Sequence, residues 1–113
     1  MNLNAEKIAT NLRKGVLEYC VLALLSERDM YGLEIANQLV ELELTASEGS
    51  LYPLLARMKD AGTVQTRWEQ VDGSRSRKYY AITGSGKESL ELFGSVWGQL
   101  SNQVDSLLGG HHV

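Results

Sequence analysis

The sequence predicts a mainly α-helical domain that carries a two-stranded β-hairpin and ends in a separate helix. Three observations lead to this prediction. Apolar residues recur at helical spacing in the first half of the chain, an Asp-Gly pair stands between two alternating segments in the second half, and the last segment repeats apolar residues in heptads. The 113 residues, 43% hydrophobic and 22% charged, have the length and composition of one globular domain.

Two helices are expected in the first part of the chain. In residues 5–25 the apolar side chains are spaced by three or four positions, at Ile8, Leu12, Val16 and Tyr19. The second half of this segment is so rich in apolar residues that we expect it to be buried nearly all round. The polar sequence Ser-Glu-Arg-Asp interrupts the pattern, and a second helix with one apolar face is expected over about residues 30–42.

A third helix is expected to begin between residues 45 and 47, because residues 45–48 fit a capping box. It should end at Gly62, since glycine suits the left-handed position that follows a helix. Pro53 complicates this prediction, because a proline inside a helix removes a hydrogen bond and crowds the carbonyl four residues earlier. One alternative is a single helix with an irregular first turn, which we favour. The other is a helix that begins near Ser50.

The second half of the chain predicts a hairpin followed by a long helix. Residues 63–70 and 77–83 alternate like strands, and the Asp72-Gly73 pair between them is a strong hairpin signal. A helix is expected over about residues 85–108. Its apolar residues form a heptad seam at Leu90, Phe93, Trp97, Leu100, Val104 and Leu107.

This order of three helices, a hairpin and a final helix is that of a winged helix-turn-helix with an added C-terminal helix. The net charge of −3 argues against nucleic acid as a partner, but residues 47–83 carry six basic and four acidic residues. Contacts with phosphates need local positive charge rather than a basic chain. An ordinary charged surface explains the charge pattern alone equally well.

The third helix and the hairpin are therefore candidates for nucleic-acid binding. A recognition helix presents short polar and basic side chains to the major groove, and a wing contacts the backbone or the minor groove. The candidate residues are Ser47, Ser50, Tyr52 and Arg57 in the helix and Arg75, Arg77 and Lys78 in the hairpin. The alternative is that both segments are simply solvated.

Three linked motifs carry a resemblance to a known family. The sequences YGLEIANQL, SEGSLYPLLARMKDAGTV and DGSRSRKYYAITGSGKESL resemble the PadR family of bacterial transcriptional regulators in their order and spacing. The match covers about residues 14–92. The family's third helix also contains a Tyr-Pro pair, so the resemblance accounts for Pro53.

The resemblance implies a homodimeric repressor that binds a palindromic operator and releases it when a small effector binds. It implies recognition-helix contacts at Ser47, Ser50, Tyr52, Pro53 and Arg57, and wing contacts at Arg75, Arg77 and Lys78. Because one helix follows the hairpin, the chain is similar to the short subfamily, in which that helix forms the dimer. An exposed apolar seam supports the same expectation, because a partner helix would cover it.

Trp97 lies in the middle of the seam and has two interpretations. It is either an aromatic anchor of the core or, as in drug-binding short members of the family, one half of a pair that stacks a flat ligand at the dimer centre. Gly94 and Gly98 would leave open space beside it. The family's drug-binding pattern includes an acid near this tryptophan, but this chain has Ser101 there, which argues against cationic ligands. The expected effector and dimer residues are Leu12, Gly15, Tyr19, Phe93, Trp97, Leu100, Ser101 and Val104.

We therefore expect a DNA-binding domain over residues 1–83, with its first helix contributing to the dimer, a dimerisation helix over 84–108 and a tail over 109–113. The partners are double-stranded DNA, a second copy and a small aromatic or apolar effector. One cysteine and two terminal histidines form neither a metal site nor a catalytic group, so no cofactor and no enzyme activity are expected. The sequence has no membrane span or secretory signal, which indicates a cytoplasmic protein. The alternative is a winged-helix adaptor that binds another protein.

Overall fold

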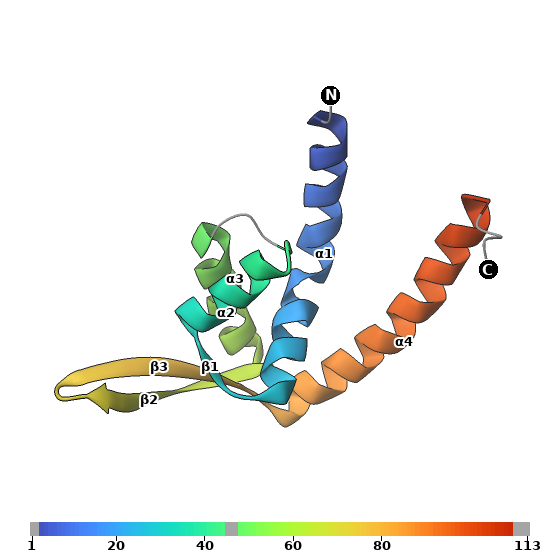
Figure 1. Ribbon diagram of the computed structural model, residues 1–113. Coiled ribbons are helices and arrows are strands. Elements are labelled where there is room, and N and C mark those ends of the chain that lie inside the picture. The colour runs from blue at the N-terminus through green and yellow to red at the C-terminus, as the bar shows by residue number, and fades with distance from the viewer. Residues whose placement is uncertain (1–2, 45–47, 110–113) are drawn as a thin grey trace.

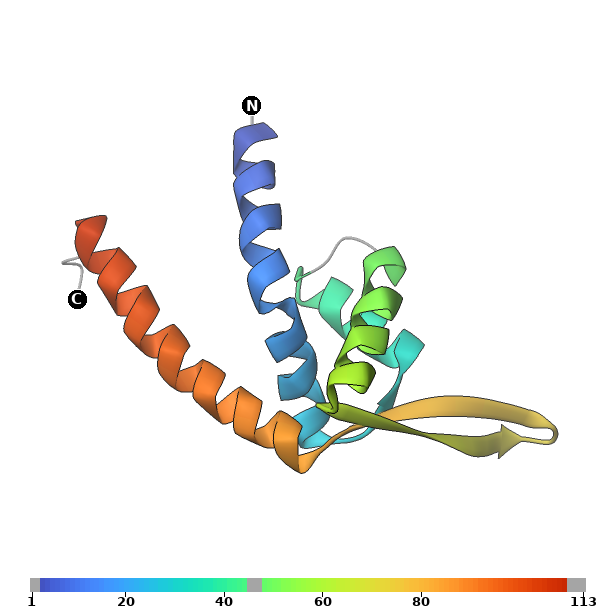
Figure 2. The ribbon, with the colours of Figure 1, turned by 180° about the vertical axis from the view of Figure 1, so that it is seen from behind.

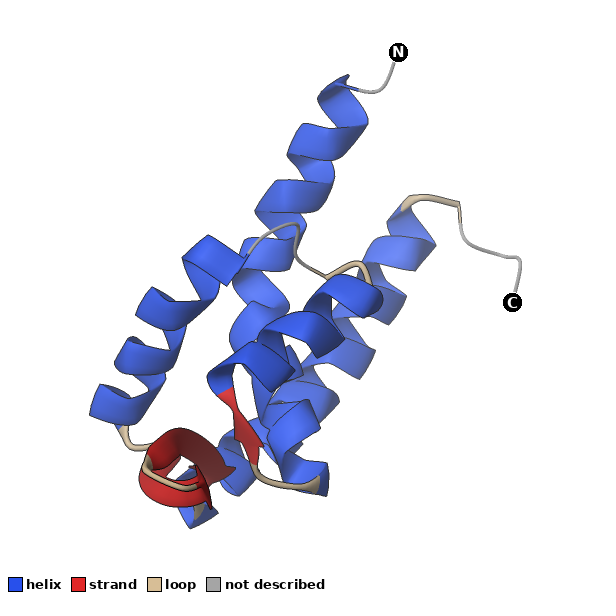
Figure 3. Cartoon of the chain, turned by 60° about the vertical axis from the view of Figure 1, so that its left-hand side comes forward, coloured by secondary structure: helices blue, strands red, loops and turns tan. Residues whose placement is uncertain are grey.

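The computed structural model of the protein describes residues 3–44 and 48–109 (Figure 1). The elements follow the order α1, β1, α2, a short 3-10 turn, α3, β2, β3 and α4. Helices make up most of the described chain, and the strands lie at one end of the helical part, as the view along the hairpin in Figure 3 shows. The predicted mainly α-helical winged helix-turn-helix is therefore confirmed, with one added strand.

Helix α1 (Leu3–Glu27) has two different halves. Val21, Leu22 and Leu25 in its second half are buried in the core, whereas Leu12 in its first half is exposed. Figure 1 shows that this first half extends beyond the other helices of the winged domain. The helix contains the predicted range 5–25, and its apolar second half is buried as expected.

Helix α2 (Gly32–Glu41) begins two residues later than predicted. Met30–Tyr31 forms a short strand, β1, which pairs antiparallel with β3 through Met30–Tyr80 and Tyr31–Tyr79. Tyr31 has an extended backbone (φ −87°, ψ 164°), and its N–H donates to Glu34 Oε1 at 3.3 Å. Residues 30 and 31, expected at the start of the second helix, instead add a third strand to the predicted two-stranded wing, because local helical periodicity carries no sign of this long-range pairing.

The segment before helix α3 (Leu51–Ala61) is a 3-10 turn over Glu48–Ser50. Pro53 thus falls in the first turn of α3, where a missing N–H is tolerated. The structure agrees with the alternative that begins the helix near Ser50, and the favoured α-helical start at 45–47 lies outside the described residues. Gly62 (φ +84°) ends the helix as predicted, with the hydrogen-bond pair of a Schellman motif.

The wing consists of strands β2 (Val64–Asp72) and β3 (Arg75–Ile82), and the three strands have the order β1-β3-β2. Both strands reach further towards the turn than the predicted ranges 63–70 and 77–83. A bulge lies between Gln70 and Asp72, and Gly73 takes a positive φ of 54° in the turn. The predicted Asp-Gly hairpin is therefore confirmed.

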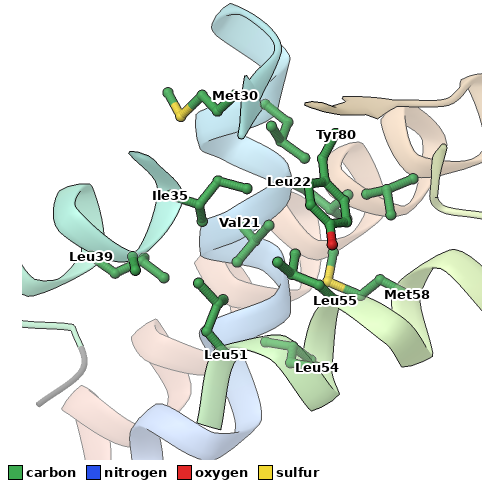
Figure 4. Close-up of a cluster of buried hydrophobic side chains, with 13 residues drawn as sticks. Val21, Leu22, Met30, Ile35, Leu39, Leu51, Leu54, Leu55, Met58 and Tyr80 are labelled. Carbon is green, nitrogen blue, oxygen red and sulfur yellow. The ribbon is translucent and has the colours of Figure 1, made fainter. Parts of the chain in front are cut away.

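The core lies between α1, α2 and α3, and the base of the wing closes one side of it. In Figure 4 apolar side chains from the three helices point towards one another, and Tyr80 of β3 packs against them. The buried residues are Val21, Leu22, Leu25, Met30, Ile35, Ala36, Leu39, Leu51, Leu54, Leu55, Met58, Val64 and Tyr80. This core fixes α3 and the wing relative to each other.

Helix α4 (Gly84–Leu107) starts at the base of the wing and contributes little to that core. The Thr83 hydroxyl accepts a hydrogen bond from the Gly86 N–H at 3.0 Å and donates one to the Gly62 carbonyl at 2.6 Å, which caps the helix and ties it to the end of α3. Figures 1 and 2 show that α1 and α4 diverge from a shared base, so the far half of each helix extends away from the wing.

Candidate nucleic-acid interface and apolar cleft

Helix α3 has the two faces expected of a recognition helix. Leu51, Leu54, Leu55 and Met58 are buried in the core. The predicted contact residues Ser50, Tyr52, Pro53 and Arg57 are all exposed. Ser47, the remaining predicted contact of this segment, lies outside the described residues. The exposed face of α3 therefore has hydroxyl-bearing residues near its start and a guanidinium further along the helix.

Strand β3 of the wing carries the three predicted cations. Arg75 is exposed, and Arg77 and Lys78 are half-buried. The guanidinium carbon of Arg77 lies 4.2 Å from the centre of the Tyr31 ring, and Lys78 Nζ lies 5.7 Å from the centre of the Tyr80 ring. Among the described residues no carboxylate pairs with these cations, so their charges are available to an anionic partner.

A different arginine anchors the wing. Arg67 of β2 pairs with Asp29, in the joint between α1 and β1, at 2.5 Å and with Glu69 at 2.7 Å. The hydrogen bonds to Glu69 and Asp29 raise the pKa of Arg67 above its usual value. Its guanidinium also lies 5.1 Å from the centre of the Tyr79 ring. These contacts leave Arg67 a structural role, which sequence reasoning did not find because Asp29 is 38 residues away.

A groove of about 470 Å³ lies between the wing and the starts of α2 and α3. We call it the wing groove. It brings Tyr52 of α3 together with all three predicted wing cations. Its lining consists of Tyr31, Gly32, Leu33, Tyr52, Trp68, Arg75, Arg77, Lys78 and Tyr80, without a carboxylate. Sequence reasoning placed Trp68 in an alternating strand and Tyr31 at the start of one of the family motifs, but it gave neither residue a role in binding.

A second, apolar cleft of about 650 Å³ lies between α1 and α4. Six of the residues predicted for an effector or dimer site line it: Leu12, Gly15, Tyr19, Phe93, Trp97 and Leu100. The structure does not bring Ser101 and Val104 into this lining. Ser101 donates a hydrogen bond from its hydroxyl to the Gly98 carbonyl of its own helix, and Val104 is exposed further along α4.

Three stacked rings form the wall of the apolar cleft. The Tyr19 and Phe93 rings are nearly parallel, with centroids 4.3 Å apart, and the Phe93 and Trp97 centroids are 5.9 Å apart. Trp97 is 50% exposed in the single chain, so it is not a buried residue of the core. A Cβ added at Gly94 or Gly98 would meet no atom within 4 Å, which agrees with the open space predicted beside Trp97.

Sequence reasoning missed the polar residues that line this cleft. Asn11 and Arg13 of α1 and Ser89 of α4 belong to its lining, which also includes Val16, Leu92 and Val96. Arg13 is the single charged side chain among the lining residues. The three- and four-residue spacing of Leu12, Val16 and Tyr19 was the available signal for this face of α1.

The described residues contain no group of three or more histidine, cysteine, aspartate and glutamate side chains that could hold a metal ion. No helix within residues 3–44 and 48–109 is long and apolar enough to cross a membrane.

A helical core that presents an exposed third helix beside a basic hairpin defines a winged-helix nucleic-acid-binding protein. Comparison with known proteins gives the family. Residues 21–92 match the model of the transcriptional regulator PadR-like family, so the chain belongs to this family. Members of the family are transcriptional regulators rather than enzymes, and the protein is accordingly a DNA-binding regulator.

Solved structures agree with this assignment. A PadR-like transcriptional regulator from Bacillus cereus is 39% identical, with 89% of this chain and 99% of that chain covered and a TM-score of 0.80. A PadR family regulator from Eggerthella lenta is 30% identical, with 92% and 88% covered and a TM-score of 0.79. An uncharacterized protein from Lysinibacillus sphaericus is 26% identical over 106 residues, which are 91% of this chain and 97% of that protein.

Proposed function

We propose that the protein is a homodimeric repressor that binds a palindromic operator and releases it when a small aromatic or apolar effector binds between α1 and α4. The observation that carries this proposal is the apolar cleft, which continues along α4 as an exposed apolar face. DNA binding and effector binding then occupy opposite sides of one winged domain.

The exposed face of α4 supports the dimer. Leu92, Val96, Trp97, Leu100, Val104 and Leu107 are all at least 43% exposed in the single chain. Such a continuous apolar surface is unfavourable in water unless another surface covers it. A second copy related by a twofold axis would cover both faces at once and would present two recognition helices to two half-sites.

A charge substitution on this face tests the dimer. Leu100→Asp with Val104→Asp should convert the protein to a monomer in sedimentation velocity, because each carboxylate would be buried at the interface. Gln99→Asp with Asn102→Asp introduces the same charges at exposed polar positions of α4 and should leave the dimer intact. A dimer that survives the first pair would contradict the role of α4.

The operator follows from the exposed face of α3 and the cations of the wing. Selection of the native protein against a randomised duplex pool should enrich a palindrome with half-sites about ten base pairs apart. Affinity for that duplex should fall steeply between about 50 and 200 mM salt, since each phosphate contact releases counterions. If no sequence is enriched and binding is no tighter than about micromolar, the operator proposal fails and a protein adaptor becomes the better explanation.

A triple substitution separates the regulator from the adaptor. Arg75→Gln, Arg77→Gln and Lys78→Gln together should abolish operator binding, because they remove the cations of the wing. An adaptor that binds its partner through α4 would be unaffected by these changes. The readout is expression of a reporter gene whose promoter contains the enriched operator, which the triple variant should no longer repress.

The aromatic wall of the apolar cleft supports a flat apolar effector. The lining holds one charged side chain, Arg13, and no carboxylate, which favours neutral or acidic aromatic molecules over cationic ones. In the Trp68→Phe variant, Trp97 is the remaining tryptophan and reports binding directly by its fluorescence. The matched control is Trp97→Phe, whose emission should not respond.

Release requires the effector to bind the DNA-free arrangement more tightly than the DNA-bound one. We propose that a ligand between α1 and α4 changes the angle between the two α4 helices of the dimer and so the distance between the recognition helices. Operator affinity should then fall by the ratio of the effector's affinities for the two states. A saturating ligand that leaves operator affinity unchanged would contradict this mechanism.

A further inference from the structure

We propose that the wing groove holds one sugar–phosphate strand of the operator duplex and that Trp68 packs against a deoxyribose of that strand. The inference rests on the proposed DNA binding and assigns a contact residue in addition to those of the recognition helix and the three cations of the wing. It explains why a large apolar side chain is exposed on the part of the hairpin that extends beyond the core.

The register of the wing determines where Trp68 lies. Residues directly opposite each other in an antiparallel pair project from the same face of the sheet, and Trp68 lies opposite Lys78, just as Val64 lies opposite Ile82. Val64 is buried in the core, whereas Trp68, four residues further along β2, is 68% exposed. Trp68 therefore continues the inward-facing side of the wing past the end of the core.

The charges around Trp68 fit a polyanion. Arg75, Arg77 and Lys78 line the same groove, and no carboxylate is among its lining residues. Glu69, which lies opposite Arg77 in the β2–β3 register, is held by Arg67 at 2.7 Å. The cations of the groove thus keep their charge for a partner, and a basic or neutral protein surface would not complement them.

The position of the groove beside the recognition helix favours duplex DNA over other polyanions. Tyr52 of α3 lines the groove together with Trp68, so the groove is continuous with the exposed face of the recognition helix. A duplex whose major groove receives α3 must pass one backbone strand over this edge. Phosphates would meet the cations, and the apolar face of a sugar would meet the indole, which offers a large flat apolar surface.

The chain offers a direct probe of this contact, because Trp68 and Trp97 are its two tryptophans. In Trp97→Phe, Trp68 is the remaining fluorophore. We would titrate this variant with a dye-labelled mixed-sequence duplex of 30 base pairs at low salt, follow binding by anisotropy of the dye, and measure quenching of the indole by acrylamide. Binding should lower the acrylamide quenching constant of Trp68 at least twofold.

The salt dependence then separates Trp68 from its charged neighbours. Trp68→Ala should weaken binding about fivefold or more, at the low end of what aromatic contacts with nucleic acids contribute, without changing the slope of log affinity against log salt. Lys78→Gln should reduce that slope by about 0.9, since it removes one phosphate contact. Trp68→Phe should recover most of the affinity. Gln65→Ala is the matched control, because Gln65 is exposed on the opposite face of β2.

The outcomes distinguish this inference from the proposed function. If Trp97→Phe binds the duplex but Trp68 stays equally accessible to acrylamide, and Trp68→Ala binds as the native protein does, the groove assignment is wrong and DNA binding stands. If the native protein shows no binding to the labelled duplex by anisotropy, the proposed function fails and the inference fails with it. Tighter binding to the corresponding single strand than to the duplex would also overturn the inference, because stacking of Trp68 on an unpaired base would then explain its protection from acrylamide.

Discussion

The guanidinium of Arg77 lies over the ring of Tyr31, with its central carbon 4.2 Å from the ring centre. This contact links the wing to the first residue before α2. Tyr31 is itself held by its pairing with Tyr79 in the sheet and by the bond from its N–H to Glu34. The stack therefore restricts a wing cation that would otherwise sample many rotamers.

The first prediction concerns this stack. Tyr31→Leu should weaken operator binding about twofold to fivefold, the range expected for loss of an exposed cation–π contact. The salt dependence of binding should not change, because the charge of Arg77 remains. Tyr31→Phe keeps the ring and should bind as the native protein does. Equal damage from the leucine and phenylalanine variants would show that the ring does not act through Arg77.

The second prediction concerns the joint between the wing and α4. A Cβ at Gly86 would lie 2.2 Å from the carbonyl oxygen of Thr63, and that oxygen accepts the Thr83 N–H at 3.1 Å. Gly86→Ala should therefore lower the free energy of unfolding by about 1–3 kcal/mol, the usual effect of overpacking. Urea denaturation measures the change. Gly84→Ala, with no atom within 4 Å of its Cβ, should change stability by less than about 1 kcal/mol.

The elements of the fold that depend on local sequence patterns could be predicted from the sequence. The helices, the Asp-Gly turn and the end of α3 at Gly62 depend on local patterns and were predicted within a few residues. Strand β1 was missed because Met30 and Tyr31 find their partners about 50 residues later in β3. Pro53 fits the structure because a 3-10 turn precedes it and leaves it in the first turn of α3.

The two candidate sites also differ in how far they could be predicted from the sequence. The apolar cleft was largely predictable, because a heptad seam on α4 and a matching face of α1 both appear as periodic patterns. The basic residues of the wing were predictable from their clustering near a turn. The wing groove was not, since Tyr31, Tyr52 and Trp68 come from three separate elements and meet only in the folded chain.

The third prediction concerns the aromatic wall of the apolar cleft. Phe93 is the middle ring of three, between Tyr19 and Trp97. Phe93→Ala should lower the free energy of unfolding by about 2 kcal/mol, less than for a fully buried phenylalanine because Phe93 is only half-buried. Thermal unfolding measures this change. Ser95→Ala, at an exposed position of the same helix, should have almost no effect. An equally stable Phe93→Ala variant would mean that the stack does not hold α1 against α4.

The fourth prediction concerns alkaline pH. Burial raises the pKa of Tyr80 above its usual value of about 10, so the unfolded chain loses this proton at a lower pH than the folded protein does. Between these two pKa values the folded state binds more protons, and stability falls as pH rises. The contribution is fully present below about pH 10 and is lost as pH rises through the folded-state pKa.

Urea denaturation from pH 8 to 11 should therefore show stability decreasing above about pH 10, with a slope of at most about 1.4 kcal/mol per pH unit from this one group. Tyr80→Phe cannot ionise at this position and should show a shallower decrease. The difference between the two proteins should be constant at pH 8 to 9, which provides an internal control for any change in packing. A difference that stays constant up to pH 11 would mean that Tyr80 ionises equally easily in the folded and unfolded chains.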